Sequence, residues 1–224
     1  MKFAHVRAVL FDLDGTLIDS APDLAWAADQ LRRTRGLEPL PLAHYRPAVG
    51  AGARGLIHAA LGLGPEHPEF DALKHEFFDT YQGCMHQRTQ AFEQVNETVA
   101  ALLQYGMAWA VVTNKIERFA LPITAALPLF ASAGTVIGGD TTAHPKPHPA
   151  PLLEAARRLG CAPAHCIYVG DDRRDIEAGR AAGMATVAAL YGYIGHADDP
   201  HTWGADAAIR APLELLNFLQ SGVH

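Results

Sequence analysis

Two aspartates that flank a single leucine, Asp12 and Asp14, follow a short apolar segment near the start of the chain. Because side chains alternate along an extended strand, both carboxylates can lie on one side while Leu13 turns toward the core. Carboxylates this close repel each other, and a hard cation with oxygen ligands would relieve the repulsion. The pattern indicates a metal-assisted acidic site, or else a solvated turn at Asp14-Gly15.

A second pair of acids, Asp171 and Asp175, lies four residues apart in the segment GDDRRD. We expect a strand to end and a helix to begin there. The two acids could therefore take part in a metal site, one as a direct ligand and the other by contacting the ligands. The alternative is an ordinary acidic helix start, because acids in the first turn are favoured by the helix dipole.

Two further polar groups follow apolar segments or precede helices. Thr113 and Asn114 could hydrogen-bond an anion beside a helix N-terminus, although both residue types are also common helix caps. Lys146 lies between two prolines, which would stiffen its backbone and aim a point positive charge. The alternative for Lys146 is a solvated surface lysine.

The predicted fold brings these polar groups to the same edge of one sheet. Short apolar segments at 7–12, 109–113, 135–137, 166–170 and 185–190 predict buried strands. Helical patterns lie between the later ones: one capped by Asn96 and ending before Gly106, others at 149–159 and 172–182. The alternation predicts an α/β fold with a doubly wound, Rossmann-like parallel sheet, whose ligands bind at the carboxyl ends of the strands.

The segment from 18 to 90 interrupts this alternation, because it carries only helical patterns, for example at 52–61 and 69–82. An all-helical stretch of this length is too long for a simple crossover. We therefore expect a core made of residues 1–17 and 91–224, with a small helical cap domain inserted at 18–90.

Composition limits the classes of partner. The net charge of -6 argues against nucleic-acid binding, which needs a dense basic face. No apolar stretch approaches the roughly 20 residues that span a bilayer, so we expect no membrane association. The three cysteines have no metal-ligand spacing and are expected to be reduced thiols. Together these features predict a cytoplasmic protein, either a monomer or a homodimer.

Four motifs, DLDGT, VVTNK, KPHPAP and VGDDRRDIEAGRAAG, follow one another along the chain. In this order they resemble the haloacid dehalogenase-like superfamily, in its phosphoglycolate phosphatase branch. The resemblance implies Mg²⁺-dependent hydrolysis of a small phosphate monoester, with Asp12 as a nucleophile that becomes phosphorylated. It also implies that Lys146 offsets negative charge.

The resemblance also assigns the other site residues. It implies that Thr16, Thr113 and Asn114 bind the substrate. It implies Mg²⁺ ligands from the Asp12 carboxylate, the Asp14 backbone carbonyl and Asp171, with Asp175 in the metal site behind them.

Asp14 narrows the chemistry within the superfamily. It would protonate the leaving group and later deprotonate the attacking water. Relatives that dehalogenate lack this second acid, and relatives that cleave phosphonates need a lysine in the cap, where only Lys74 is found. A phosphomutase would share all four motifs, whereas a receiver-type phospho-acceptor would be about half as long and would not need Asp14.

The substrate is less closely determined. Arg54, beside glycines at a predicted helix start of the cap, could bind a substrate carboxylate or could simply be exposed. Phosphoglycolate is the substrate of the resembled branch. The segments GAR, YGYI and WGAD are more similar to N-acetylmuramic acid 6-phosphate phosphatases, whose substrate also carries a carboxylate. We expect a carboxylated ester of the phosphoglycolate type, with the sugar phosphate as the alternative.

Overall fold

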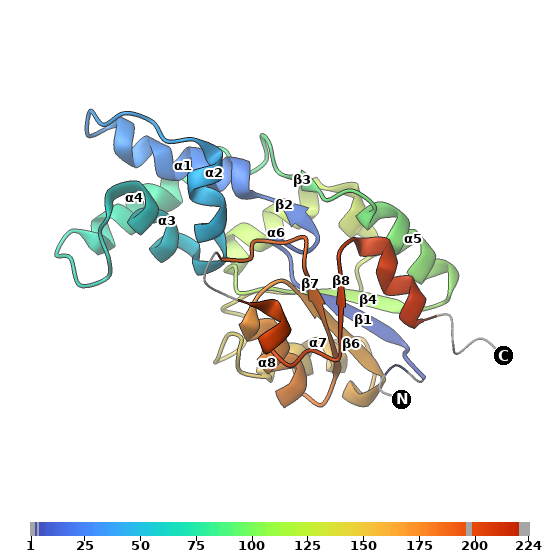
Figure 1. The fold of residues 1–224 in the computed structure, drawn as a ribbon. Helices are drawn as coiled ribbons and strands as arrows, with labels where there is room; N and C mark the ends of the chain where they lie inside the picture. The colour runs from blue at the N-terminus through green and yellow to red at the C-terminus, as the bar shows by residue number, and fades with distance from the viewer. Residues whose placement is uncertain (1–2, 4, 196–198, 220–224) are drawn as a thin grey trace. The chain divides into compact units, whose positions relative to one another are not determined.

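The computed structural model describes residues 3, 5–195 and 199–219, and within them the chain forms two compact units (Figure 1). The first unit contains the chain up to Ile18, then Ala91–Ile194, and the chain again from Asp199. The second contains Asp19–Gln90 together with Gly195. The units are described separately below.

The first unit is built on a parallel sheet. Among the described residues the sheet has six strands in the order β5-β4-β1-β6-β7-β8, and all of its pairings are parallel. The strands are β1 (Ala8–Phe11), β4 (Ala108–Val112), β5 (Val136–Ile137), β6 (Cys166–Gly170), β7 (Ala185–Ala189) and β8 (Ala207–Ile209). The predicted doubly wound sheet is thus confirmed, and β8 is an additional short edge strand.

Helices connect these strands. They are α5 (Val95–Gln104), α6 (Glu117–Ala126), α7 (Ala150–Arg158) and α8 (Arg173–Ala181), with 3-10 turns η2 (Pro128–Ser132), η3 (Pro163–His165), η4 (Pro200–Thr202) and η5 (Pro212–Phe218). Asn96 was predicted to cap α5, and this is wrong. The helix begins at buried Val95 after Gln94, whose φ is 67°. Packing of Val95 evidently outweighs the capping preference of Asn96.

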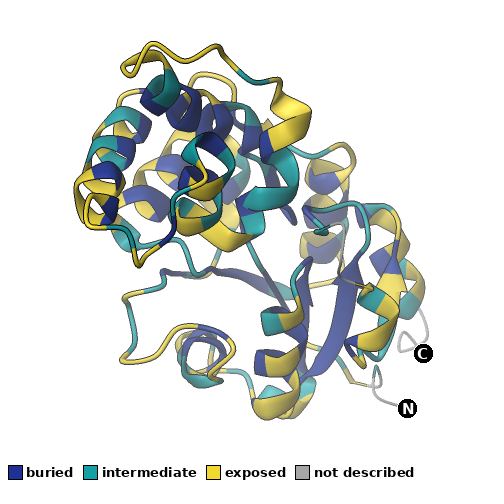
Figure 2. Cartoon of the chain, turned by 60° about the vertical axis from the view of Figure 1, so that its left-hand side comes forward, coloured by how far each residue is buried: buried dark blue, intermediate teal, exposed yellow. Residues whose placement is uncertain are grey.

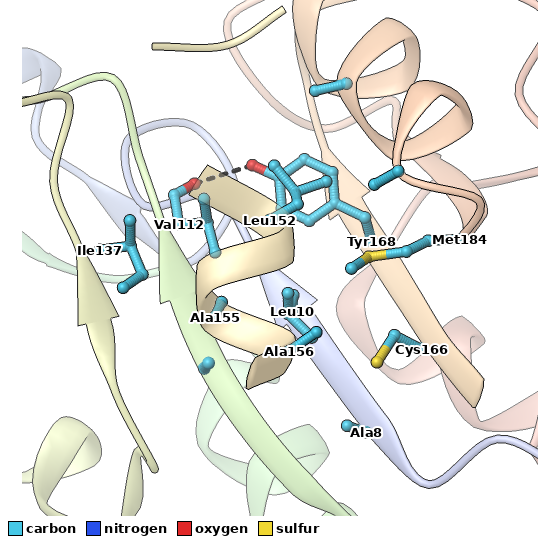
Figure 3. Packing of buried hydrophobic residues seen from close by; sticks show 13 residues of the cluster. Ala8, Leu10, Val112, Ile137, Leu152, Ala155, Ala156, Cys166, Tyr168 and Met184 are labelled. Carbon is cyan, nitrogen blue, oxygen red and sulfur yellow. Dashed lines mark hydrogen bonds between the residues drawn. The ribbon is translucent and has the colours of Figure 1, made fainter. Parts of the chain in front are cut away.

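The two faces of the sheet are covered by different helices (Figure 1). On one face, α7 and α8 pack on side chains from β1, β4 and β6, as Figure 3 shows for Leu10, Leu152 and Ala155. Alanines on these helices allow the backbones to approach the sheet closely. On the other face, α5 packs on β4 and on η5. Both faces of the central strands β1, β4 and β6 are therefore buried, which explains their largely apolar sequences.

The second unit is helical apart from its ends. It contains α1 (Ala21–Arg33), α2 (Leu42–Tyr45), the 3-10 turn η1 (Arg46–Ala51), α3 (Gly52–Leu61) and α4 (Phe70–Gln82). The apolar face of α1 packs against α3 and α4, and Figure 2 shows the buried residues on the faces that these helices share. Two short strands, β2 (Ile18–Asp19) and β3 (Gln90–Ala91), pair where the chain passes between the units.

No helix in the described ranges combines the length and the apolar character that a membrane crossing requires.

Candidate active site

The carboxyl ends of three central strands meet at one edge of the sheet. β1 pairs with β4 on one side and with β6 on the other, so the residues that follow these strands are neighbours. Asp12 follows β1, Thr113 follows β4 and Asp171 follows β6. The Asp12 amide donates a 2.9 Å hydrogen bond to the Val169 carbonyl of β6, which fixes this arrangement.

Three carboxylates converge at this edge. Asp12, Asp171 and Asp175 each present an oxygen, and these oxygens lie within 4.8 Å of one another. Asp171 and Asp175 are buried. Burial, together with the charges of Asp12 and Asp175, holds the pKa of Asp171 well above its ordinary value. Such a cluster of hard oxygen donors could hold a divalent cation.

Asp171 is fixed on both of its oxygens. Thr16 Oγ1 donates to Oδ1 at 2.8 Å, and the Tyr193 amide donates to Oδ2 at 2.7 Å. Gly15, whose φ is 85°, and Gly192 approach the carboxylate so closely that a Cβ atom at either position would collide with it. The Thr16 hydroxyl therefore orients Asp171, and its predicted contact with substrate stays a prediction.

Asp175 has two functions in the structure. It forms a capping box with Asp172 at the start of α8, in which its Oδ2 accepts a 3.1 Å hydrogen bond from the Asp172 amide. Its Oδ1 lies 2.7 Å from the Lys146 ammonium. Burial raises the pKa of Asp175 to about 6, with Lys146 opposing the increase and Asp12 adding to it. The capped helix start and the acidic site thus share one residue.

Lys146 is the cation of this cluster. Its side chain is buried, and Nζ lies 2.9 Å from Asp12 Oδ1. Nζ also donates to the Val112 carbonyl at 3.0 Å and to the Tyr168 hydroxyl at 2.7 Å. Burial lowers the pKa of Lys146, but Asp12 and Asp175 raise it more, so that it stays above its ordinary value. A solvated surface lysine, the alternative considered above, is excluded.

The contact between Lys146 and Asp12 is an ion pair without the angles of a hydrogen bond. The two atoms are 2.9 Å apart, yet Asp12 Oδ1 accepts no hydrogen bond among the described residues although it is buried. The short distance establishes the electrostatic attraction, and the missing hydrogen bond leaves this oxygen available to a further ligand.

Asn114 and Thr113 organise the loops around Lys146. The side-chain Nδ2 of Asn114 donates to the backbone carbonyl of Lys146 at 2.9 Å. The Asn114 Oδ1 accepts from the backbone amide of Lys146, also at 2.9 Å. Buried Thr113 Oγ1 accepts from the Lys115 amide at 3.1 Å. These bonds hold the loop after β4 and the loop that carries Lys146 together. Substrate contacts of Asn114 and Thr113 stay predictions.

Asp14 and Arg54 lie outside the acidic cluster. The Asp14 carboxylate pairs with Lys115, whose Nζ lies 2.9 Å from each of its oxygens. Arg54 is an exposed residue of α3, in the second unit. No hydrogen bond or ion pair of its guanidinium is found within the described residues, and its predicted contact with substrate remains a prediction.

Three contributors were not predicted as site residues. Tyr168 belongs to an apolar strand, so its pattern indicates only a core residue. Tyr193 contributes through its backbone amide, for which a sequence carries little signal. Lys115 is part of the VVTNK motif, and this motif could have identified it.

The fold is a doubly wound α/β core, and its carboxylates and buried lysine lie at the carboxyl ends of the strands. This is the position of the active site in enzymes of this class, and the carboxylates there could bind a divalent cation. The chain belongs to the haloacid dehalogenase-like hydrolase family, whose sequence model matches residues 9–189. The family predicted from the four motifs is therefore confirmed.

Individual relatives cover nearly the whole chain. N-acetylmuramic acid 6-phosphate phosphatase from Pseudomonas aeruginosa is 41% identical over 219 residues, which is 98% of this chain and 97% of the relative. Phosphoglycolate phosphatase from Xanthomonas campestris is 45% identical over 209 residues, 93% of this chain and 94% of the relative. The crystal structure of a predicted phosphoglycolate phosphatase from Haemophilus somnus superposes with a TM-score of 0.83 at 28% identity, covering 96% and 98% of the two chains.

Proposed function

We propose that this chain is a magnesium-dependent phosphatase that hydrolyses a small carboxylated phosphate monoester through a phosphorylated Asp12. One observation carries the proposal: a buried ammonium, Lys146, lies 2.9 Å from an Asp12 oxygen that accepts no hydrogen bond among the described residues. A nucleophilic carboxylate needs such a cation, because the phosphate dianion would otherwise repel it. Relatives named as phosphatases along nearly the full chain support the same conclusion.

The reaction has two steps, and Asp12 and Asp14 act in both of them. In the first step, an Asp12 oxygen bonds to phosphorus, the bond from phosphorus to the ester oxygen breaks, and Asp14 gives a proton to the leaving group. In the second step, Asp14 takes a proton from water. The water oxygen bonds to phosphorus and the Asp12–phosphorus bond breaks. Lys146 remains positively charged throughout and stabilises the negative charge around Asp12.

The acidic cluster fits Mg²⁺. The ligands would be the Asp12 carboxylate, the Asp14 carbonyl and Asp171. Burial and the charges of Asp12 and Asp175 raise the pKa of Asp171, and a bound cation would offset both effects. Asp175 would lie behind them, because its Oδ1 already pairs with the Lys146 ammonium at 2.7 Å and its Oδ2 caps α8. When bound, Mg²⁺ would offset charge on Asp12 and on the phosphoryl oxygens.

Two substrates remain in this proposal. Phosphoglycolate is supported by the Xanthomonas relative and by the motifs of the branch. N-acetylmuramic acid 6-phosphate is the second candidate, supported by the Pseudomonas relative that matches 98% of this chain. Both compounds carry a carboxylate and a phosphate ester, so the site chemistry described above suits either.

A kinetic screen with Mg²⁺ tests the proposal. The substrates would be phosphoglycolate, N-acetylmuramic acid 6-phosphate and p-nitrophenyl phosphate. We expect hydrolysis of a carboxylated ester without a bisphosphate primer, its loss in EDTA, and its return when Mg²⁺ is restored. Full activity after EDTA treatment would contradict the metal assignment. Phosphoryl transfer that depends on a primer, with little hydrolysis, would indicate a mutase instead.

A further inference from the structure

Lys115 has no role in the mechanism described so far, yet it is well placed to affect it. Its side chain is 8% exposed, and its Nζ lies 2.9 Å from both carboxylate oxygens of Asp14, whose side chain is 17% exposed. The contact joins the loop after β1 to the loop after β4, across 101 residues of sequence. A charge-assisted contact to both oxygens limits rotation of the carboxylate.

The backbone around Lys115 is itself held in place. The Lys115 amide donates to Thr113 Oγ1 at 3.1 Å, and the Lys115 carbonyl accepts from the Gly139 amide at 2.9 Å. Gly139 approaches the Asn114 backbone so closely that a Cβ atom there would collide with it. The lysine thus extends from a fixed loop, and its ammonium is directed before any substrate arrives.

Each of the two aspartates of the DLDGT motif is paired with a different lysine. Lys146 lies beside Asp12, and Lys115 lies beside Asp14. We infer that Lys115 is a positioning residue that holds the Asp14 carboxylate where it accepts the proton of the attacking water. The inference rests on the proposed function, because it assumes that Asp14 acts as the base of the second step.

With p-nitrophenyl phosphate as the substrate, this role predicts a defect in the second step only. The ammonium of Lys115 contacts the carboxylate, which is the form of Asp14 that accepts a proton. In the second step a water O–H bond breaks, its proton passes to Asp14, the water oxygen bonds to phosphorus, and the Asp12–phosphorus bond breaks. The first step with p-nitrophenyl phosphate needs no proton, because p-nitrophenolate leaves as a stable anion. Loss of Lys115 should therefore slow release of phosphate from Asp12 and spare formation of the phosphoenzyme.

Rapid mixing of the full chain with p-nitrophenyl phosphate and Mg²⁺ tests this separation. In Lys115→Met we expect a burst of p-nitrophenolate approaching one per site, at a rate within about threefold of the wild-type first turnover. We expect steady-state turnover to be about 10- to 100-fold lower, part of what acid-base catalysis supplies. Lys115→Arg should recover much of the loss. An equal decrease in burst and steady-state rates, or no decrease in either, would overturn the inference.

A double-mutant cycle tests whether Lys115 acts through Asp14. Lys115→Met should cause no further loss in an Asp14→Asn background, and an additive loss there would overturn the inference. The double variant removes both charges, so the cycle remains informative if the single variant folds poorly with an unpaired carboxylate. A wild-type chain that hydrolyses no phosphate ester would overturn the proposed function, whereas normal hydrolysis with no coupling would overturn this inference alone.

Discussion

The Tyr168 side chain serves both the core and the site. Its ring packs among the apolar residues that α7 and α8 cover, and its hydroxyl donates a 2.7 Å hydrogen bond to the Val112 carbonyl, drawn in Figure 3. The same hydroxyl accepts from Lys146 at 2.7 Å. Tyr168 thereby helps to hold the Lys146 ammonium in its position beside Asp12.

Tyr168→Phe tests this support. The substitution keeps the ring but leaves Lys146 with one partner fewer in a buried place. We expect the free energy of unfolding to fall by about 1–3 kcal/mol, the usual cost of a lost buried hydrogen bond to a charged group. Turnover should fall as well, because Lys146 loses a fixed partner. Urea unfolding and steady-state kinetics measure the two effects.

A matched tyrosine provides the control. Tyr105 is 40% exposed, and Tyr105→Phe should change the free energy of unfolding by less than about 0.5 kcal/mol. If both tyrosine variants behaved alike, the Tyr168 hydroxyl would have no special role.

The sequence predicted the charged residues of the site better than their partners. Asp12, Asp171, Asp175 and Lys146 converge because each follows or precedes an element whose position the strand pattern predicts. The substrate contact expected of Thr16 stays a prediction, whereas the hydrogen bond from its hydroxyl to Asp171 was not predicted. Which partner a small polar side chain chooses depends on distances of tenths of an ångström between loops, and a sequence pattern does not contain them.

At the scale of elements, Asp29 links α1 to the segment that follows it. Its Oδ1 accepts from the Leu40 amide at 2.9 Å and from the Tyr45 hydroxyl at 3.1 Å, and its Oδ2 accepts from Arg33 at 2.9 Å. Burial alone would raise the pKa of Asp29, but these hydrogen bonds lower it below its ordinary value. The ionised form is therefore bound more tightly in the folded chain than in the unfolded one.

This shift predicts a pH-dependent effect of Asp29→Asn. A lowered pKa in the folded state stabilises the fold above the ordinary aspartate pKa of about 3.9, and the stabilisation is lost as the pH falls. We expect Asn to reduce the free energy of unfolding by about 1–3 kcal/mol near neutral pH. The difference from wild type should shrink as the pH falls below about 4, because Asp29 is protonated first in the unfolded chain and, at lower pH, in the folded chain as well.

Urea unfolding at several pH values measures this difference. Glu38→Gln, which removes an exposed acid from the same unit, should have little effect at any pH. A cost of Asp29→Asn that stayed constant down to acid pH would contradict the proposed role of the charge.

The elements themselves were predicted well where apolar pattern and length agree. The helix predicted at 52–61 is α3 (Gly52–Leu61), and the strand predicted at 166–170 is β6 (Cys166–Gly170). β8 was missed because a three-residue edge strand, Ala207–Ile209, carries too little pattern. At α5 the cap was wrong because burial of Val95, a tertiary effect, determined where the helix begins.

At the scale of the whole molecule, the helical second unit is the candidate cap. We propose that it closes over the site during turnover, which would exclude water until Asp12 is phosphorylated. Arg54 lies near the start of α3 in this unit and is exposed, and its contact with a substrate carboxylate is part of this proposal.

Arg54→Ala tests the contribution of this unit to substrate recognition. We expect kcat/KM for the carboxylated ester to fall by about 2–4 kcal/mol, the scale of a lost charge-assisted pair. Hydrolysis of p-nitrophenyl phosphate, which has no carboxylate, should be almost unchanged. Parallel assays of the two esters measure the contrast.

Lys74→Ala is the matched control, because it removes another exposed cation from the same unit. It should leave both substrates unaffected. An equal loss on both esters in Arg54→Ala would point to cap closure or phosphate binding, and no loss on either would leave Arg54 as an ordinary exposed residue.

Turnover of Asp12→Asn is the most direct test of the mechanism. An amide cannot form the phosphoenzyme, so we predict that turnover of every phosphate ester falls by about three orders of magnitude or more. The melting curve should show a folded protein, because Asn has nearly the same size as Asp. Activity within about tenfold of wild type, from a folded Asp12→Asn protein with Mg²⁺ present, would contradict a covalent mechanism at Asp12.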